Sequence, residues 1–233
     1  RSIWPAPAPR PRKPRAPRLP KGAACPPDQA ACKLGLLGNA CGLPALLVLA
    51  AAQGRPVPRV ARYCLVSAAR LRPSHDPTRG FRPRPDYPVS VQERDYQRDK
   101  AEQLKVQGIA QNMIPELIFN GAPGAIDGPP VSTEEGVVLG GNGRTMALQL
   151  HYAQGGQVPA DFLRANGALF GFSAAQVGEL TDPVVVRVIP SDDAKTTRQL
   201  QELVRLLNVP LTQALDIRSE SVAEAKRLSD EVF

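Results

Sequence analysis

The pattern of apolar and polar positions predicts a folded domain of mixed strands and helices from about residue 60 onwards. Short runs rich in β-branched residues predict strands at residues 60–66, 130–133, 137–139 and 183–190. Helical patterns are expected at residues 92–111, 144–153 and 159–165 and through most of 191–233. The inner side of the first helix is expected to carry Tyr96, Leu104 and Ile109.

Two irregular regions interrupt this pattern. A long proline-rich loop is predicted at residues 73–88, between the first strand and the first helix. A second region, rich in glycine and proline, covers residues 120–130 and precedes two short strands that residues 134–136 join. Loops of such length inside a compact domain are usually functional or disordered, so they direct attention to their neighbourhood.

The segment from residue 34 to residue 52 carries no charge and has to be tested as a membrane span. Glycines and a proline interrupt it, and the clean run from Pro44 to Ala52 reaches about half of a bilayer core of roughly 30 Å. We therefore predict a short buried helix within an apolar segment at residues 25–58, and no membrane partner. A secretory signal or a membrane anchor is the alternative.

Positive charge is concentrated at the start of the chain. Residues 1–60 hold ten Lys and Arg against one acidic residue, whereas residues 61–233 hold 19 against 21. The Pro- and Arg-rich stretch at residues 1–24 cannot bury enough apolar surface to fold, which predicts a disordered leader. DNA binding through this basic leader is the sharper hypothesis. Composition does not argue for a basic groove in the remaining domain, and we expect a cytoplasmic protein.

The most informative stretch is the run from Gly136 to Leu148, in which an apolar strand enters a glycine-rich turn and then a helix. Backbone N–H groups are unpaired at the first turn of a helix, and glycines let a ligand approach them. Arg144 adds a permanent cation whose planar donors suit phosphate. The pattern predicts an anion site, while the alternative is a tight structural turn with Arg144 on the surface.

The same residues carry a resemblance to a known family. The strand at residues 137–139, the turn Gly141-Asn-Gly-Arg144 and Ala147 are similar to the Gly-Glu-Arg-Arg-x-x-Ala signature of the ParB/sulfiredoxin superfamily. The loop at residues 73–77 and the segment 206–210, with Ser219, Glu220 and Ala223 after it, resemble further parts of ParB proteins. The Gly-Gly-Asn-x-Arg-Thr-Met variant most resembles the DdrB-like ParB-superfamily domains of phage and plasmid proteins, over about residues 60–233.

The resemblance implies an α+β fold: a small mixed sheet with surrounding helices, a nucleotide-binding core at residues 59–190 and a helical extension at residues 191–233. It implies a nucleotide triphosphate as ligand, CTP or ATP, with Mg²⁺. Asn142 occupies the position of the sulfiredoxin cysteine, so reduction of sulfinic acids is not expected. Asn142 and Gly143 also replace the Glu and Arg of ParB, which leaves one cation fewer for a triphosphate.

These arguments select candidate site residues. The nucleotide or phosphate group is expected to contact Ser74, Gly140, Gly141, Asn142, Gly143, Arg144, Thr145 and Asn208. The catalytic candidates are His75, Asp76 and Glu134. Several of these residues have a plainer structural alternative. Asp76 fits an Asx-type turn, Glu134 fits a solvent-exposed hairpin, and the binding candidate Asn208 fits a helix cap. No metal centre is expected from cysteines spaced by six, eight and 22 residues.

Three classes of function follow from the sequence. The first is a ParB-like nucleotide-binding domain, with NTP hydrolysis as an extension, in a DNA-processing or mobile-element protein. The second is a DNA-binding or nuclease module, and the third is a catalytically inactive scaffold or interaction domain. The chain does not begin with Met and ends within a helical pattern, so we expect part of a longer polypeptide, with a homodimer as a further expectation.

Overall fold

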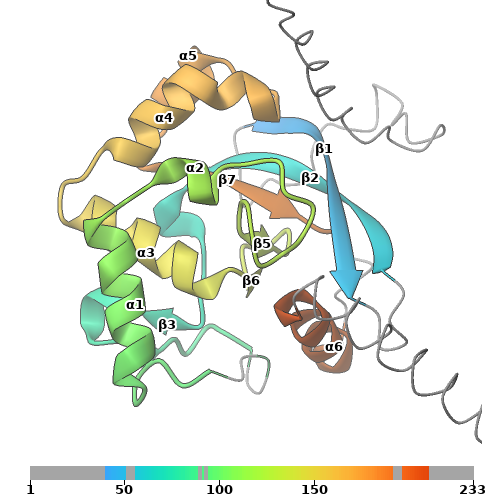
Figure 1. The fold of residues 1–233 in the computed structure, drawn as a ribbon, viewed down its shortest axis with the longest axis vertical. Coiled ribbons are helices and arrows are strands. Elements are labelled where there is room, and N and C mark those ends of the chain that lie inside the picture. The colour runs from blue at the N-terminus through green and yellow to red at the C-terminus, as the bar shows by residue number, and fades with distance from the viewer. Residues whose placement is uncertain (1–39, 51–55, 89–90, 92–93, 191–195, 210–233) are drawn as a thin grey trace, which may run out of the picture. The chain divides into compact units, whose positions relative to one another are not determined.

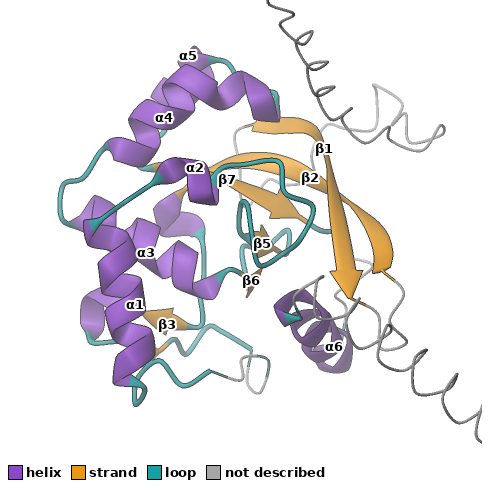
Figure 2. Cartoon of the chain, viewed as in Figure 1, coloured by secondary structure: helices purple, strands orange, loops and turns teal. Residues whose placement is uncertain are grey.

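The computed structural model describes residues 40–50, 56–88, 91, 94–190 and 196–209. The predicted leader at residues 1–24 and most of the predicted C-terminal extension lie outside these ranges. Within them the protein is an α+β fold, as expected, with a mixed sheet flanked by helices (Figure 1, Figure 2). No helix in this described part is long and apolar enough to cross a membrane.

The main sheet has five strands in the order β1-β2-β7-β5-β6. The strand β5 pairs in parallel with β7, and all other neighbours are antiparallel. The strands are β1 Ala40–Ala50, β2 Pro56–Ser67, β5 Val131–Ser132, β6 Val138–Gly140 and β7 Pro183–Val188. A separate two-stranded hairpin joins β3 His75–Asp76 to β4 Arg82–Pro83. The sequence predictions for β2, β5, β6 and β7 are confirmed.

The helices cover the sheet and extend beside it. They are α1 Lys100–Gln111, α2 Pro115–Ile118, α3 Asn142–Ala153, α4 Val158–Asn166, α5 Ala174–Gly178 and α6 Thr197–Asn208. Short 3-10 turns occur at η1 Ala68–Arg70, η2 Pro77–Arg79 and η3 Gly167–Phe170. The pair α1 and α3 pack together, while α6 packs against β6 and β1 (Figure 1). The predicted helices at residues 144–153 and 159–165 are confirmed.

The short helix predicted from Pro44 to Ala52 is wrong, because its described residues, 44–50, belong to the edge strand β1. Ala45, Leu47 and Leu49 are buried at alternate positions, which is the period of a strand with one face on the core. A short uncharged run does not distinguish a strand from a helix by composition, and pairing with β2 decides the outcome. Pro44 is tolerated because β1 is an edge strand with a register shift between Cys41 and Pro44.

The predicted inner face of α1 is also wrong. Leu104 and Ile109 are 67% and 37% exposed, whereas the buried positions are Gln103, Val106 and Ala110. The Gln103 amide donates hydrogen bonds to the carbonyl groups of Tyr96 and Gln97, which fixes the rotation of the helix. The helix begins at Lys100 because Asp99 caps the N–H groups of the first turn. Tyr96 is buried as expected, although it precedes the helix.

Arg187 is a cation in the interior of the sheet. It lies on β7 with 0% of its surface exposed, among strand residues that are all buried. Its guanidinium donates hydrogen bonds of 2.8–3.0 Å to four backbone carbonyls, those of Ala122, Gly124, Asp127 and Pro129. Burial lowers the pKa of Arg187 to about 10, so the group remains charged at neutral pH. The predicted turn region at residues 120–130 is therefore wrapped around an arginine.

We predict that Arg187→Lys destabilises the domain by about 2–4 kcal/mol, because one ammonium group cannot serve four separated carbonyls. The free energy of unfolding in urea, followed by circular dichroism, measures this loss. Arg164→Lys is the matched control, since Arg164 is exposed on α4 and pairs with the exposed Asp161. The control should change stability by less than about 0.5 kcal/mol. Equal unfolding midpoints for the two variants would contradict the role assigned to Arg187.

Candidate functional site

The glycine-rich turn leads from β6 into α3 as predicted. Gly141 has a φ of 80°, and a Cβ atom there would lie 2.8 Å from Nη2 of Arg144, so glycine is required for both conformation and space. No side chain caps the helix, and its first hydrogen bond runs from Thr145 N to Gly141 O at 2.9 Å. By helix geometry the N–H groups of Asn142, Gly143 and Arg144 have no acceptor within the helix. This end of α3 favours an anion.

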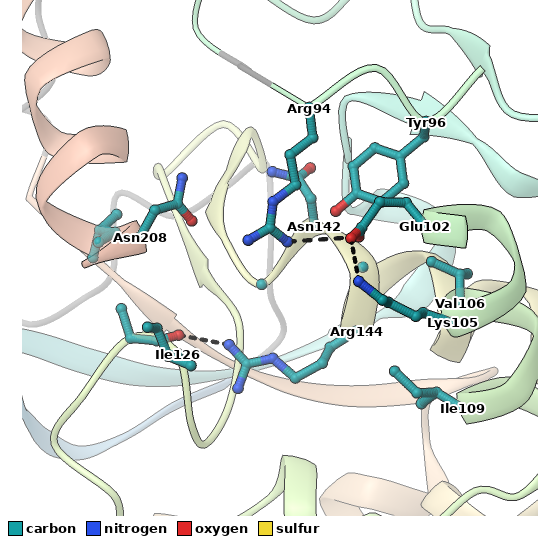
Figure 3. Close-up of a pocket in the computed structure, with 14 residues that line it drawn as sticks. Arg94, Tyr96, Glu102, Lys105, Val106, Ile109, Ile126, Asn142, Arg144 and Asn208 are labelled. Atoms are coloured by element: carbon teal, nitrogen blue, oxygen red, sulfur yellow. Dashed lines mark hydrogen bonds and ion pairs between the residues drawn. The ribbon is translucent and has the colours of Figure 1, made fainter. Parts of the chain in front are cut away.

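A cavity of about 230 Å³ opens at this end of α3 (Figure 3). Its wall combines the segment before α1, α1 itself, the loop at residues 120–130, the glycine turn and the end of α6. The lining residues are Arg94, Tyr96, Glu102, Lys105, Val106, Ile109, Ala125, Ile126, Gly141, Asn142, Gly143, Arg144, Leu207 and Asn208. Segments far apart in the sequence thus meet at the N-terminus of one helix.

Two cations and one carboxylate from the α1 side face this cavity. Nζ of Lys105 lies 2.6 Å from Oε1 of Glu102, and Nη1 of Arg94 lies 3.8 Å from Oε2 of the same group. The side chains of Arg94 and Lys105 are 56% and 66% exposed, whereas that of Glu102 is only 19% exposed. The hydrogen bond and the charge of Glu102 raise the pKa of Lys105. Figure 3 shows the carboxylate between the two cations.

Arg144 lines the cavity with both of its terminal nitrogens already engaged by backbone carbonyls. Its Nη1 donates to Gly128 O at 2.5 Å and its Nη2 donates to Ala125 O at 2.6 Å. Burial lowers its pKa to about 10, and the charge of Asp127 opposes that shift. Arg144 therefore adds positive charge to the cavity at neutral pH, but its two terminal nitrogens hold the loop at residues 120–130.

Asn142 is buried, and its side chain serves the fold. Its Oδ1 accepts from Ser74 N at 2.8 Å, and its Nδ2 donates to Val138 O at 3.2 Å. These bonds join the proline-rich loop to the glycine turn. The part of Asn142 that remains for a ligand is its backbone N–H at the start of α3.

The structure brings together five of the eight predicted binding residues. Gly141, Asn142, Gly143, Arg144 and Asn208 line the cavity, whereas Ser74, Gly140 and Thr145 do not. Gly140 faces Val131 and Leu207, and the Thr145 hydroxyl donates to Gly141 O. Ser74 is buried, and its backbone N–H donates a hydrogen bond to the side chain of Asn142.

The catalytic candidates are not gathered at the cavity, since neither His75, Asp76 nor Glu134 lines it. His75 is buried, with Nδ1 2.9 Å from the Ser74 hydroxyl and Nε2 4.0 Å from the Asp95 carboxylate. Asp76 accepts from both the N–H and the hydroxyl of Thr78, which confirms the Asx-type turn. The described residues contain no group of three or more His, Cys, Asp or Glu that could hold a metal ion.

Sequence reasoning missed Arg94, Tyr96, Glu102 and Lys105, which line the side of the cavity opposite Asn208 (Figure 3). It placed Arg94 on a continuous charged helix from residue 92. Instead, the chain between Arg94 and Asp99 is not helical, and Arg94 pairs with Glu102 eight residues further on. The one local signal was the pair Glu102 and Lys105, whose i,i+3 spacing puts the two side chains together on a helix.

These features define a class: a small mixed α+β domain whose glycine turn and helix N-terminus open into a cationic cavity. Residues 57–190 match the ddrB-like ParB superfamily domain. The chain belongs to this family, which confirms the resemblance read from the turn. Comparison with curated proteins gave no match, and comparison with solved structures gave none either. The family match includes β2 through β7 but neither β1 nor α6.

We predict that His75 makes stability depend on pH. Burial lowers the pKa of His75, and the charge of Asp95 only partly offsets this. The unfolded chain takes up a proton near pH 6.5 while the folded protein resists it, so this contribution is complete above pH 6.5 and is lost as the pH falls. Relative to His75→Gln, the wild type should lose up to about 1.4 kcal/mol per pH unit below 6.5. Urea unfolding at pH 5 to 8 measures this, and parallel profiles would refute it.

Proposed function

We propose that this domain binds a nucleotide or another phosphate-bearing ligand in the cavity at the N-terminus of α3. The observation that carries the proposal is the convergence of unpaired helix N–H groups with Arg94 and Lys105 on one cavity. A phosphate has several acceptor oxygens and a charge that favours such a helix end. Membership of the ddrB-like ParB superfamily supports the same site.

The charge of the cavity favours an anion. Arg94, Lys105 and Arg144 supply three positive charges against one carboxylate, that of Glu102. Because Arg144 is held by carbonyl oxygens, its charge is fixed in place, whereas Arg94 and Lys105 are exposed enough to move. The proposal therefore assigns the direct side-chain contacts to Arg94 and Lys105, and the backbone contacts to residues 142–144.

The size of the cavity limits which part of a nucleotide it holds. Its volume of about 230 Å³ is below the roughly 300–1,000 Å³ of pockets that enclose a whole drug-sized ligand. We assign most of the cavity to the phosphate groups, so that the nucleoside extends out of it past the exposed lining residues Ile109 and Ile126 or past Asn208. Mg²⁺ would arrive with the phosphates, and hydrolysis would add a step to the binding proposed here.

Calorimetric titration with CTP, ATP, GTP and their diphosphates, with and without Mg²⁺, tests the proposal. Lys105→Met should weaken binding about tenfold, which is about 1.4 kcal/mol, because one exposed charge-assisted contact is lost. Lys100→Met is the matched control, since Lys100 lies on the same helix and outside the cavity. A folded protein that gives no heat with any of these ligands, or equal weakening by the two variants, would contradict the proposal.

We propose nucleic-acid binding as a second candidate function, because the structure gathers arginines on the β3–β4 hairpin. Arg79, Arg82 and Arg84 line a hollow of about 360 Å³, and only Arg79 and Arg84 have carboxylate partners in the described structure. Phe81 anchors the hairpin, since it is 3% exposed and holds a φ of 57° that is rare outside glycine. A rigid loop with exposed guanidinium groups suits the phosphates of a nucleic-acid strand.

This second candidate predicts a salt-dependent loss. Arg79→Ala with Arg82→Ala should reduce oligonucleotide affinity and lower the slope of log K against log salt by up to about 2, near 0.9 for each phosphate contact. Fluorescence anisotropy at several salt concentrations measures the slope. The control variant, Arg164→Ala with Arg198→Ala, removes the same amount of charge at other positions. It should reduce the oligonucleotide affinity less than Arg79→Ala with Arg82→Ala does. A loss of oligonucleotide affinity that appears only when residues 1–24 are deleted would assign DNA binding to the leader.

A further inference from the structure

Glu102 is the one carboxylate among the residues that line the cavity, and it occupies the place between the two exposed cations (Figure 3). Its two oxygens are divided between them, Oε1 toward Lys105 and Oε2 toward Arg94. An incoming phosphate needs the same donors. The carboxylate therefore stands where a ligand anion would make its side-chain contacts.

The fold holds Glu102 in this position. Glu102 belongs to the first turn of α1, and its backbone N–H donates to the capping carboxylate of Asp99 at 3.1 Å. Its side chain is 19% exposed, whereas those of Arg94 and Lys105 are 56% and 66% exposed. Lys105 and Arg94 are thus free to turn toward solvent or a ligand, whereas the carboxylate stays at the wall of the cavity.

A fixed carboxylate affects anions according to their charge. It repels any anion that enters, and it competes with that anion for both cations. Inorganic phosphate and nucleoside monophosphates offer little more charge than Glu102 itself. Pyrophosphate and nucleoside di- and triphosphates offer more charge and more oxygen atoms, so they can hold Arg94 and Lys105 in its place.

We propose that Glu102 is an internal competitor for the cations of the cavity: it lowers the affinity for every phosphate anion, so that polyphosphates, which make more contacts, displace it and singly phosphorylated ligands do not. The proposal rests on the phosphate-binding function above. Arg94 and Lys105 exchange Glu102 for the ligand oxygens when a polyphosphate binds. Removal of the charge therefore strengthens anion binding, although it breaks two ion pairs of the free protein.

The test is calorimetry of the full chain with pyrophosphate and with inorganic phosphate, first without Mg²⁺ and then with it. Glu102→Gln keeps the shape and removes the charge, and Glu102→Ala serves as a second variant. The expected result is an affinity for pyrophosphate raised at least threefold and an affinity for inorganic phosphate that rises as well. Glu116→Gln, an exposed carboxylate in the first turn of α2, should change neither.

A second comparison separates competition for the cations from direct repulsion of the ligand. In a background of Lys105→Met with Arg94→Met, the gain from Glu102→Gln should shrink to the part due to repulsion alone, because no cations remain to be shared. Unchanged or weaker pyrophosphate binding by Glu102→Gln without Mg²⁺ would overturn the inference and leave the proposed function standing. Weakening confined to the Mg²⁺ series would instead make Glu102 a metal ligand. If neither the wild type nor either folded variant binds, the proposed function fails as well.

Discussion

Two arginines that bind backbone carbonyls hold the loop at residues 120–130, and both the sheet and the cavity depend on that loop. Arg187 reaches it from β7 and Arg144 reaches it from α3. The loop then enters β5, where Arg187 N donates to Pro130 O and the parallel pairing with β7 begins. Without the loop in this position, β5 and β6 would not lie beside β7, and α3 would not begin where it does.

This arrangement stabilises two arginine side chains that carry their positive charge inside the protein. A buried guanidinium needs acceptors, and carbonyl oxygens supply them here while Asp127 contributes from the surface. The two arginines repel one another, since the charge of Arg144 lowers the pKa of Arg187. That repulsion is tolerated because the loop surrounds both groups with oxygen atoms. The fixed charge of Arg144 adds to the positive field of the α3 N-terminus, so a residue that stabilises the fold also makes the cavity more positive.

The sequence predicted those features that local pattern controls. The strands β2, β5, β6 and β7 and the glycine turn follow from alternation, from β-branched residues and from the conformational freedom of Gly141. The cavity wall from Arg94 to Lys105 could not be predicted, because the pairing of Arg94 with Glu102 depends on how the chain turns before α1. Arg144 was recognised as a cation at the right place, but its engagement by Gly128 and Ala125 arises from a loop 16 and 19 residues away.

The family match covers most of the cavity wall, but not all of it. The glycine turn, α1 and the loop with its two arginines all lie within residues 57–190. Leu207 and Asn208 complete the cavity from α6, which lies outside that match and is held on β6 and β1 by its own apolar face. A phosphate held at α3 would place the remainder of its ligand toward this end of α6. Arg94, Lys105 and residues 142–144, to which we assign the phosphate contacts, therefore lie within the family domain, whereas α6 adds lining residues from outside it.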